Sequence, residues 1–206
     1  MSIDATTGFR RWADAGFLSE LLPIIPPGAA LAPGSSVRPE HRGKTPGTRK
    51  TDGTWIGLGG SWPDEKQTSI ADCKRYIHDG ASVGLQTRRF TALDIDVDDE
   101  PLAAAIEELA RDVLGFAPVR YRVGSPRRLM LYRAPKDQII RKRRKIKKTE
   151  AGLKAAVERL GYGQQCVVEG GHPKGGEYLW RGWHPCDEGP DGLTEVDEAT
   201  WGRLFQ

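Results

Sequence analysis

"FTALDIDVDDE", residues 90–100, places five acidic residues within seven positions, directly after a short apolar run. Alternate residues of a β-strand point to opposite faces of its sheet, so the leucine, isoleucine and valine of this stretch are expected to share one face. Asp94 and Asp96 then share the other face, about 7 Å apart along the strand. Because these carboxylates repel each other and hard divalent cations bind oxygen ligands, the spacing indicates a site for Mg²⁺ or Mn²⁺.

A plainer interpretation of these acids is also open, because DxD is a short and common pattern. The acids then mark a solvated strand end, with Asp98 or Asp99 capping the next helix. The metal interpretation requires a third carboxylate from elsewhere in the chain. The stretch alone leaves both interpretations open.

The composition is that of a globular protein with one sizeable domain or two small ones: 206 residues, 38% hydrophobic, mean hydropathy −0.53. No apolar run approaches the roughly 20 residues of a membrane span, and the N-terminus lacks the apolar core of a signal peptide. We therefore expect a cytoplasmic protein without a membrane partner. The three cysteines are far apart and odd in number, which argues against a disulfide framework.

Hydrophobic periodicity and turn residues predict the remaining elements. The chain is treated as a single domain over 1–206, α/β or α+β with an antiparallel sheet. Helices are expected over 8–21, over 69–79 with Ser69 as cap, over 99–114 with Gly115 ending it, and near 197–205 in the tail 184–206. Strands are expected over 55–58, 81–87, 89–97, 164–169 and up to Trp180, with a hairpin over 117–125 and 127–134, and a loop over 27–53.

Residues 141–160 carry two conflicting signals. The apolar spacing and the good helix formers of "EAGLKAAVERLG" mildly favour a helix. The same segment also divides into two strands joined at Gly152. Periodicity leaves both alternatives open.

The run "RKRRKIKK", residues 141–148, concentrates seven positive charges in a chain whose net charge is only +3. Basic residues that neutralise phosphates release counterions, which gives salt-dependent binding to nucleic acid. The alternative is a solvated strand or loop face. The candidate nucleic-acid contacts are Arg141, Arg143, Arg144, Lys145 and Lys147.

Four segments, in this order, resemble motifs of one family: "GKTPG" (43–47), "ASVGLQTRRFTALDIDV" (81–97), "PVRYRVGSPRRLMLYR" (118–133) and "VERLGYGQQCVVEGGHPKGGEYLW" (157–180). Together the segments resemble the archaeo-eukaryotic primase superfamily, and within it the bifunctional primase–polymerase (prim-pol) domains of phages, plasmids and mobile elements. The resemblance spans roughly residues 20–183. It implies an α+β primase–polymerase core with an antiparallel sheet like that of an RNA-recognition motif (RRM-like), plus an N-terminal α/β subdomain.

The resemblance also implies a catalytic site. It makes Glu158 the third acid, beside Asp94 and Asp96, and so favours strands over a helix in 141–160. The three carboxylates would bind two Mg²⁺ or Mn²⁺ ions. A surface glutamate on a helix is the alternative for Glu158.

Several residues are candidate contacts to the nucleotide phosphates. Many members of the family carry a histidine in the second motif, whereas this chain has "GSPRR" there. Arginine is a sound substitute, because it binds phosphate in a bidentate fork. Neighbouring strand residues point to opposite faces, so only one of the two arginines faces a site. Arg128 is favoured and Arg127 comes second, with exposed arginines on a hairpin as the alternative. The further candidates are Ser125, His172 in its glycine-rich turn and Lys44, each with a solvated side chain as the alternative.

The function implied by the resemblance is a DNA primase or DNA-directed polymerase, a nucleotidyltransferase that uses (d)NTPs on a single-stranded DNA template. A non-catalytic replication-initiator module and a metal-dependent nuclease are the alternatives. A replicative helicase, fused or separate, is the further partner expected. The sequence contains no P-loop of the GxxxxGK[ST] kind.

Overall fold

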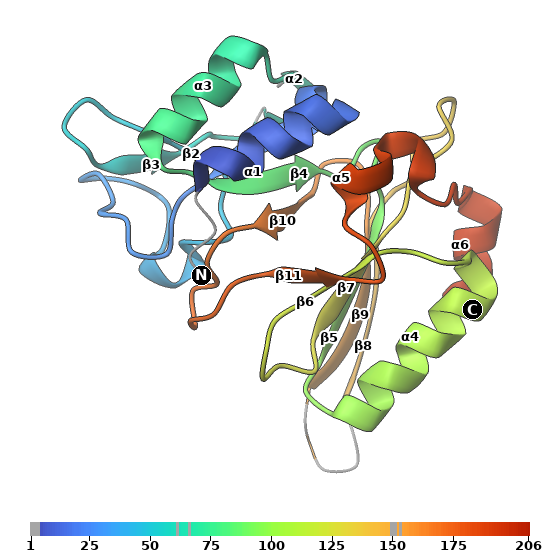
Figure 1. Cartoon of the computed structure of the whole chain (residues 1–206). Helices are drawn as coiled ribbons and strands as arrows, with labels where there is room; N and C mark the ends of the chain where they lie inside the picture. The colour runs from blue at the N-terminus through green and yellow to red at the C-terminus, as the bar shows by residue number, and fades with distance from the viewer. Residues whose placement is uncertain (1–4, 61, 66, 149–151, 153) are drawn as a thin grey trace. The chain divides into compact units, whose positions relative to one another are not determined.

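The structure, a computed structural model, describes residues 5–60, 62–65, 67–148, 152 and 154–206. The chain forms two compact units, each assembled from two segments of sequence (Figure 1). Unit 1 comprises Met1–Gln86 and Gln165–Tyr178, and unit 2 comprises Thr87–Gln164 and Leu179–Gln206. No helix within the described ranges combines the length and the apolar character needed to cross a membrane.

Unit 1 is an α+β unit around a three-stranded antiparallel sheet with the order β1-β4-β10, accompanied by the β2–β3 hairpin. Its elements are α1 (Ala5–Trp12), the π-helical turn η1 (Ala13–Phe17), the 3-10 turns η2 (Leu18–Glu20) and η3 (Pro39–His41), β1 (Leu21–Ile24), β2 (Gly47–Arg49), β3 (Trp55–Gly57), α2 (Trp62–Glu65), α3 (Ile70–Asp79), β4 (Ser82–Gln86) and β10 (Gln165–Glu169).

Local signals explain where the helices of unit 1 begin and end. Ser69 forms a capping box with Asp72 at the start of α3, and Gly80 ends the helix in a left-handed conformation with φ 73°. The predicted helix over 8–21 is confirmed as α1 followed by η1 and η2, with Gly16 at φ 99° inside the π-helical turn. The predicted loop over 27–53 also contains β2.

Unit 2 is built on a six-stranded antiparallel sheet with the order β11-β6-β7-β5-β9-β8 (Figure 1). Its elements are β5 (Ala92–Val97), α4 (Glu100–Leu114), β6 (Val119–Tyr121), β7 (Arg128–Leu131), β8 (Arg143–Lys148), β9 (Lys154–Leu160), β11 (Leu179–Arg181), α5 (Pro185–Glu188), the 3-10 turn η4 (Pro190–Gly192) and α6 (Glu198–Leu204).

One face of this sheet carries the hydrophobic core of unit 2. Leu93, Ile95 and Val97 of β5 are fully buried and cluster with Ala103 and Ala110 of α4. The predicted cap is confirmed, because the Asp99 side chain accepts a hydrogen bond from Leu102 N at the start of α4. The apolar side of the alternating strand therefore lies under α4, and its acidic side lies on the opposite face.

Within 141–160 the described residues form two strands, β8 and β9, so the helical alternative is wrong. β9 pairs with β5 on one side and with β8 on the other. Hydrogen bonding to two neighbouring strands outweighs the mild helical preference of alanine, glutamate and leucine in this segment. The α+β fold expected from the sequence is confirmed.

Candidate active site

The central feature of the acidic face is a pair of carboxylates directly opposite each other. Asp94 of β5 and Glu158 of β9 are register partners, and Asp96 follows two residues along β5 opposite Ala156. Cross-strand partners have Cβ atoms about 4.5–5.5 Å apart and share one face. The three acids predicted from the sequence therefore lie on the same face of the sheet, opposite to α4.

Arg127 binds the acids at the end of β5. Its Nη1 lies 2.5 Å from Asp96 Oδ1, and its Nε and Nη2 donate to the two carboxylate oxygens of Asp98 at 2.7 and 2.8 Å. The pKa of Arg127 is raised, chiefly by the hydrogen bond to Asp98, and the charges of Asp96 and Asp94 add to this effect. The acids on this face thus hold the cationic side chain of Arg127.

Glu158 is positioned by two further side chains. Gln164, four residues after the end of β9, donates from Nε2 to Glu158 Oε1 at 3.1 Å. Arg144 of β8 is the register partner of Glu158 on its other side, and its Nε lies 3.6 Å from Glu158 Oε2. The Glu158 side chain is only 18% exposed, so these partners compensate for much of the hydration that it loses.

The donor set of this face fits Mg²⁺ or Mn²⁺ in its chemistry. All three candidate ligands are carboxylates, the oxygen donors that such hard cations prefer, and the strand register brings them to one face. Within the described ranges no three His, Cys, Asp or Glu side chains stand close enough together to hold a metal ion. Asp96 and Glu158 are turned towards Arg127, Arg144 and Gln164 instead.

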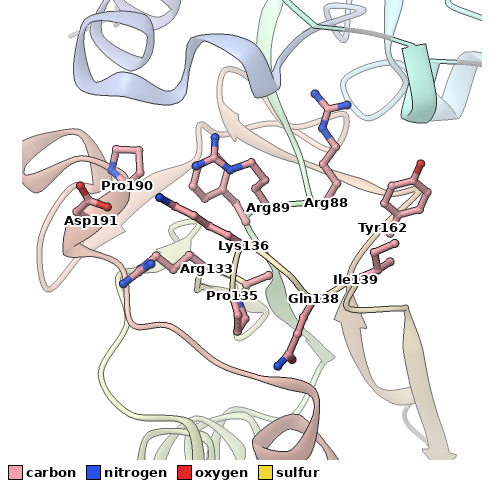
Figure 2. A pocket seen from close by; sticks show the side chains of 12 residues that line it. Arg88, Arg89, Arg133, Pro135, Lys136, Gln138, Ile139, Tyr162, Pro190 and Asp191 are labelled. Carbon is pink, nitrogen blue, oxygen red and sulfur yellow. The ribbon is translucent and has the colours of Figure 1, made fainter.

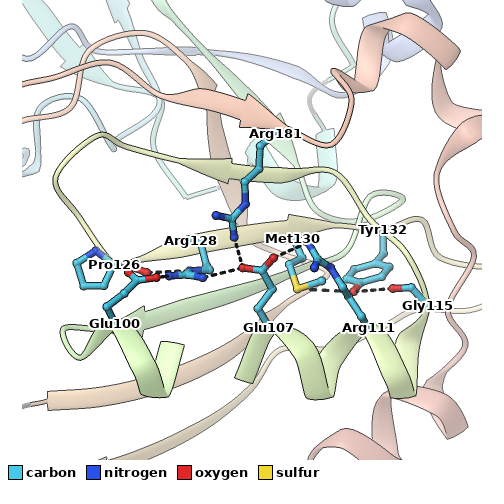
Figure 3. A network of polar contacts seen from close by, with 9 residues as sticks. All are labelled: Glu100, Glu107, Arg111, Gly115, Pro126, Arg128, Met130, Tyr132 and Arg181. Carbon is cyan, nitrogen blue, oxygen red and sulfur yellow. Dashed lines mark hydrogen bonds and ion pairs between the residues drawn. The ribbon is translucent and has the colours of Figure 1, made fainter. Parts of the chain in front are cut away.

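Arg128, the preferred phosphate contact, faces the other side of the sheet, whereas Arg127 lies beside the acids. It is the register partner of Ile95, a core residue, and its side chain is 6% exposed. Its guanidinium binds Glu107 at 2.8 Å and Glu100 at 2.5 Å, both on α4 (Figure 3). Burial alone would lower the pKa of Arg128, but the hydrogen bonds to these carboxylates raise it.

The family model for the N-terminal domain of bifunctional DNA primase/polymerases (Prim-Pol) matches residues 18–193. The chain belongs to this family. No curated protein sequence matches the chain. Membership assigns a DNA primase/polymerase type of function to the domain, and with it DNA and nucleotide substrates. The family resemblance expected over roughly 20–183 is confirmed.

The remaining candidate phosphate contacts of this Prim-Pol domain lie in turns and loops. Ser125 lies in the β6–β7 turn of unit 2, where its N–H donates to Arg122 O. In unit 1, His172 Nδ1 accepts from Lys174 N at 3.0 Å and its ring packs edge-on to Tyr178. Also in unit 1, the Lys44 side chain is exposed and its carbonyl accepts from the side chain of Gln165. Their roles stay predictions.

The described side chains of the basic run lie on both faces of the sheet. Arg144 lies on the acidic face beside Glu158, whereas Arg143 and Lys145, by strand alternation, lie on the opposite face. On that face Arg143 stacks over Phe205, and Lys145 donates to the carbonyl of Gln206. Arg141 precedes β8 and is exposed, and the side chain of Lys147 lies outside the described residues. Of the candidate template contacts in 141–148, Arg144 therefore lies on the face of the acids and Arg141 lies before the strand, and their role in template binding stays a prediction.

Two residues of the site were not predicted from the sequence. Asp98 was considered only as a cap, although it provides the bidentate contact to Arg127. Gln164 was not among the predicted site residues, although it binds Glu158. The usable signal for Gln164 was its place just after the strand that carries the third acid, since a side chain there reaches back to the strand end.

Proposed function

We propose that the chain is a template-dependent nucleotidyltransferase that makes primers, extends DNA, or does both, in the replication of a phage or another mobile element. Asp94, Asp96 and Glu158 would hold two Mg²⁺ or Mn²⁺ ions. When bound, these ions supply an activated 3′-hydroxyl and charge stabilisation of the leaving pyrophosphate. The proposal rests on the prim-pol family match and on one observation, the register that pairs Asp94 with Glu158.

The electrostatics of the acidic face support this proposal. Like charges opposite each other on a sheet are destabilising, so a fold selected only for stability gains nothing from this pair. Arg127 partly neutralises the acids now, and its side chain is 36% exposed. In the working enzyme Arg127 would exchange carboxylates for the triphosphate, because a guanidinium binds both in the same bidentate fork.

The test is primer synthesis and extension with a single-stranded template, labelled nucleotides and Mn²⁺. Template-dependent lengthening is expected from the wild type, whereas Asp94→Ala with Asp96→Ala should abolish synthesis and leave template binding largely intact. Shortening of the DNA would point instead to a nuclease, and binding without chemistry to an initiator module. Synthesis by the double variant would refute the assigned site.

A matched control removes the same number of charges elsewhere in unit 2. Glu108 and Asp112 are exposed on α4, on the other side of the sheet from the acids. Glu108→Ala with Asp112→Ala should therefore leave synthesis unchanged. A comparison of Arg144→Gln with Arg143→Gln tests the template contacts predicted in 141–148, since only Arg144 lies on the acidic face.

A further inference from the structure

A second cationic site lies in unit 2 at the opposite end of the sheet from Arg127. A cavity of about 520 Å³ opens where β5 begins and where β7 and β9 end (Figure 2). It is lined by four cationic side chains and a single carboxylate: Arg88, Arg89, Arg133, Lys136 and Asp191. None of these residues belongs to the acidic site.

The cations of this cavity come from two separate segments. Arg89 precedes β5, while Arg133 and Lys136 follow β7. Arg133 is fixed in the wall, because its Nε donates to Leu193 O and its Nη1 lies 2.5 Å from Glu195. Arg89 and Lys136 are exposed. Cations that converge on one opening attract an anion with several charges, such as a phosphate chain.

Large apolar side chains lie exposed in the same cavity. Tyr162, just beyond the end of β9, is 37% exposed, and Ile139 is 62% exposed. An exposed aromatic side chain among cations is the arrangement by which proteins bind single strands, with bases stacked on the ring and phosphates on the cations. A duplex is a poor occupant, because its bases are already stacked on one another.

We propose that this cavity binds a segment of single-stranded DNA, with backbone phosphates on Arg89 and Lys136 and a base against Tyr162. That this strand is the template rests on the proposed function. Asp94 and Asp96 lie four and six residues beyond Phe90 along extended chain, about 13 and 20 Å. At the 3.4 Å per step of one strand of a duplex these lengths equal about four to six base steps, and an extended single strand needs fewer. The cavity would therefore hold the strand several nucleotides away from the reacting end.

The test measures binding of a labelled 16-nucleotide single strand by fluorescence anisotropy, without metal or nucleotide. For a single strand, each phosphate contact contributes about −0.7 to the slope of log K against log salt concentration. Arg89→Gln with Lys136→Gln should therefore make the slope less negative by about 1.4. Tyr162→Leu should weaken binding by about 5- to 150-fold, the loss of one stacked base.

The matched control is Lys50→Gln with Lys74→Gln, which removes two exposed charges from unit 1. Its salt slope should equal that of the wild type. The proposal is overturned if the cavity variants behave like this control. It is also overturned if they lose binding of dATP, measured by calorimetry, while oligonucleotide binding stays unchanged.

The same assay separates this proposal from the proposed function. Asp94→Ala with Asp96→Ala should retain the full effect of the cavity substitutions on oligonucleotide binding, because neither aspartate lines the cavity. A protein that never synthesises DNA but shows that effect keeps the cavity site and loses the polymerase. A protein that synthesises DNA without that effect keeps the polymerase and loses the cavity site.

Discussion

Glu107→Ala is expected to destabilise unit 2 more than the removal of an exposed carboxylate from its surface would. Glu107 is 3% exposed on α4, and its carboxylate meets three guanidinium groups (Figure 3). Arg128 lies 2.8 Å from it, Arg111 lies 2.5 Å from it, and Arg181 of β11 donates to the same oxygen as Arg128. This carboxylate therefore joins α4 to two strands of the sheet.

The expected magnitude follows from the burial of the partner that remains. Arg128 is 6% exposed, so the alanine variant leaves a buried cation with fewer partners. Removal of one member of a buried ion pair typically costs 3–5 kcal/mol. Arg128 keeps Pro126 O and Glu100, but the side chain of Glu100 is 63% exposed and screened by water. We therefore expect a loss of about 3 kcal/mol, near the lower end of that range.

Urea unfolding, combined with hydrogen exchange of the α4 and β7 amides, measures this loss in unit 2 itself. Glu100→Ala is the matched control, because it removes the exposed partner of the same arginine and should cost about 1 kcal/mol or less. Tyr132, whose pKa is raised by burial, lies in the same network. If the network opens, the Tyr132 hydroxyl should lose its proton at a lower pH than in the wild type. The reasoning is refuted if Glu107→Ala costs no more than Glu100→Ala.

Two further predictions concern backbone contacts and pH. Gly161→Ala should cost about 1–3 kcal/mol, because a Cβ there would lie 2.2 Å from the carbonyl oxygen of Ile140. Gly60→Ala, where a Cβ meets nothing within 4 Å, should be close to neutral, and equal urea midpoints for both variants would contradict this. The pKa of Asp197 is lowered, chiefly by the hydrogen bond from Thr200 N. Because its pKa is lower in the folded state, the ionised Asp197 carboxylate stabilises the folded protein above the unfolded pKa of about 3.9, and this stabilisation is lost as the pH falls through the folded pKa. The difference in urea midpoint between the wild type and Asp197→Asn should therefore change below about pH 4 and stay constant between pH 5 and 8.

Elements with chemical signals at their ends could be predicted from the sequence almost to the residue. α3 begins after the Ser69 cap and ends at Gly80, and α4 begins after Asp99 and ends at Gly115. These signals are local, since a cap bonds to an amide only three residues away. The pairing of Asp94 with Asp96 on one face was also predictable, because a strand with alternating apolar and acidic residues fixes which side chains share a face, whereas Glu158 was identified only through the family resemblance.

Features that depend on long-range pairing could not be predicted in the same way. The segment that contains β9 has local helical character, and only pairing with β5 and β8 makes it a strand. The choice between Arg127 and Arg128 depends on which one is the register partner of a core residue of β5. β7 begins at Arg128, so Arg127 belongs to the turn and its direction is not set by strand alternation.

The polar partners that surround Asp96 and Glu158 indicate that the acids of this face serve function rather than stability. Directly opposed like charges are destabilising, and a threonine or valine at either position would avoid this cost. The fold instead surrounds the acids with polar partners from separate parts of the sequence: Arg127 from a turn, Arg144 from β8 and Gln164 from the loop after β9. Since each partner is itself partly exposed, water or phosphate can replace it at modest cost. Such partners stabilise the carboxylates in the free protein and still leave them able to take a divalent ion.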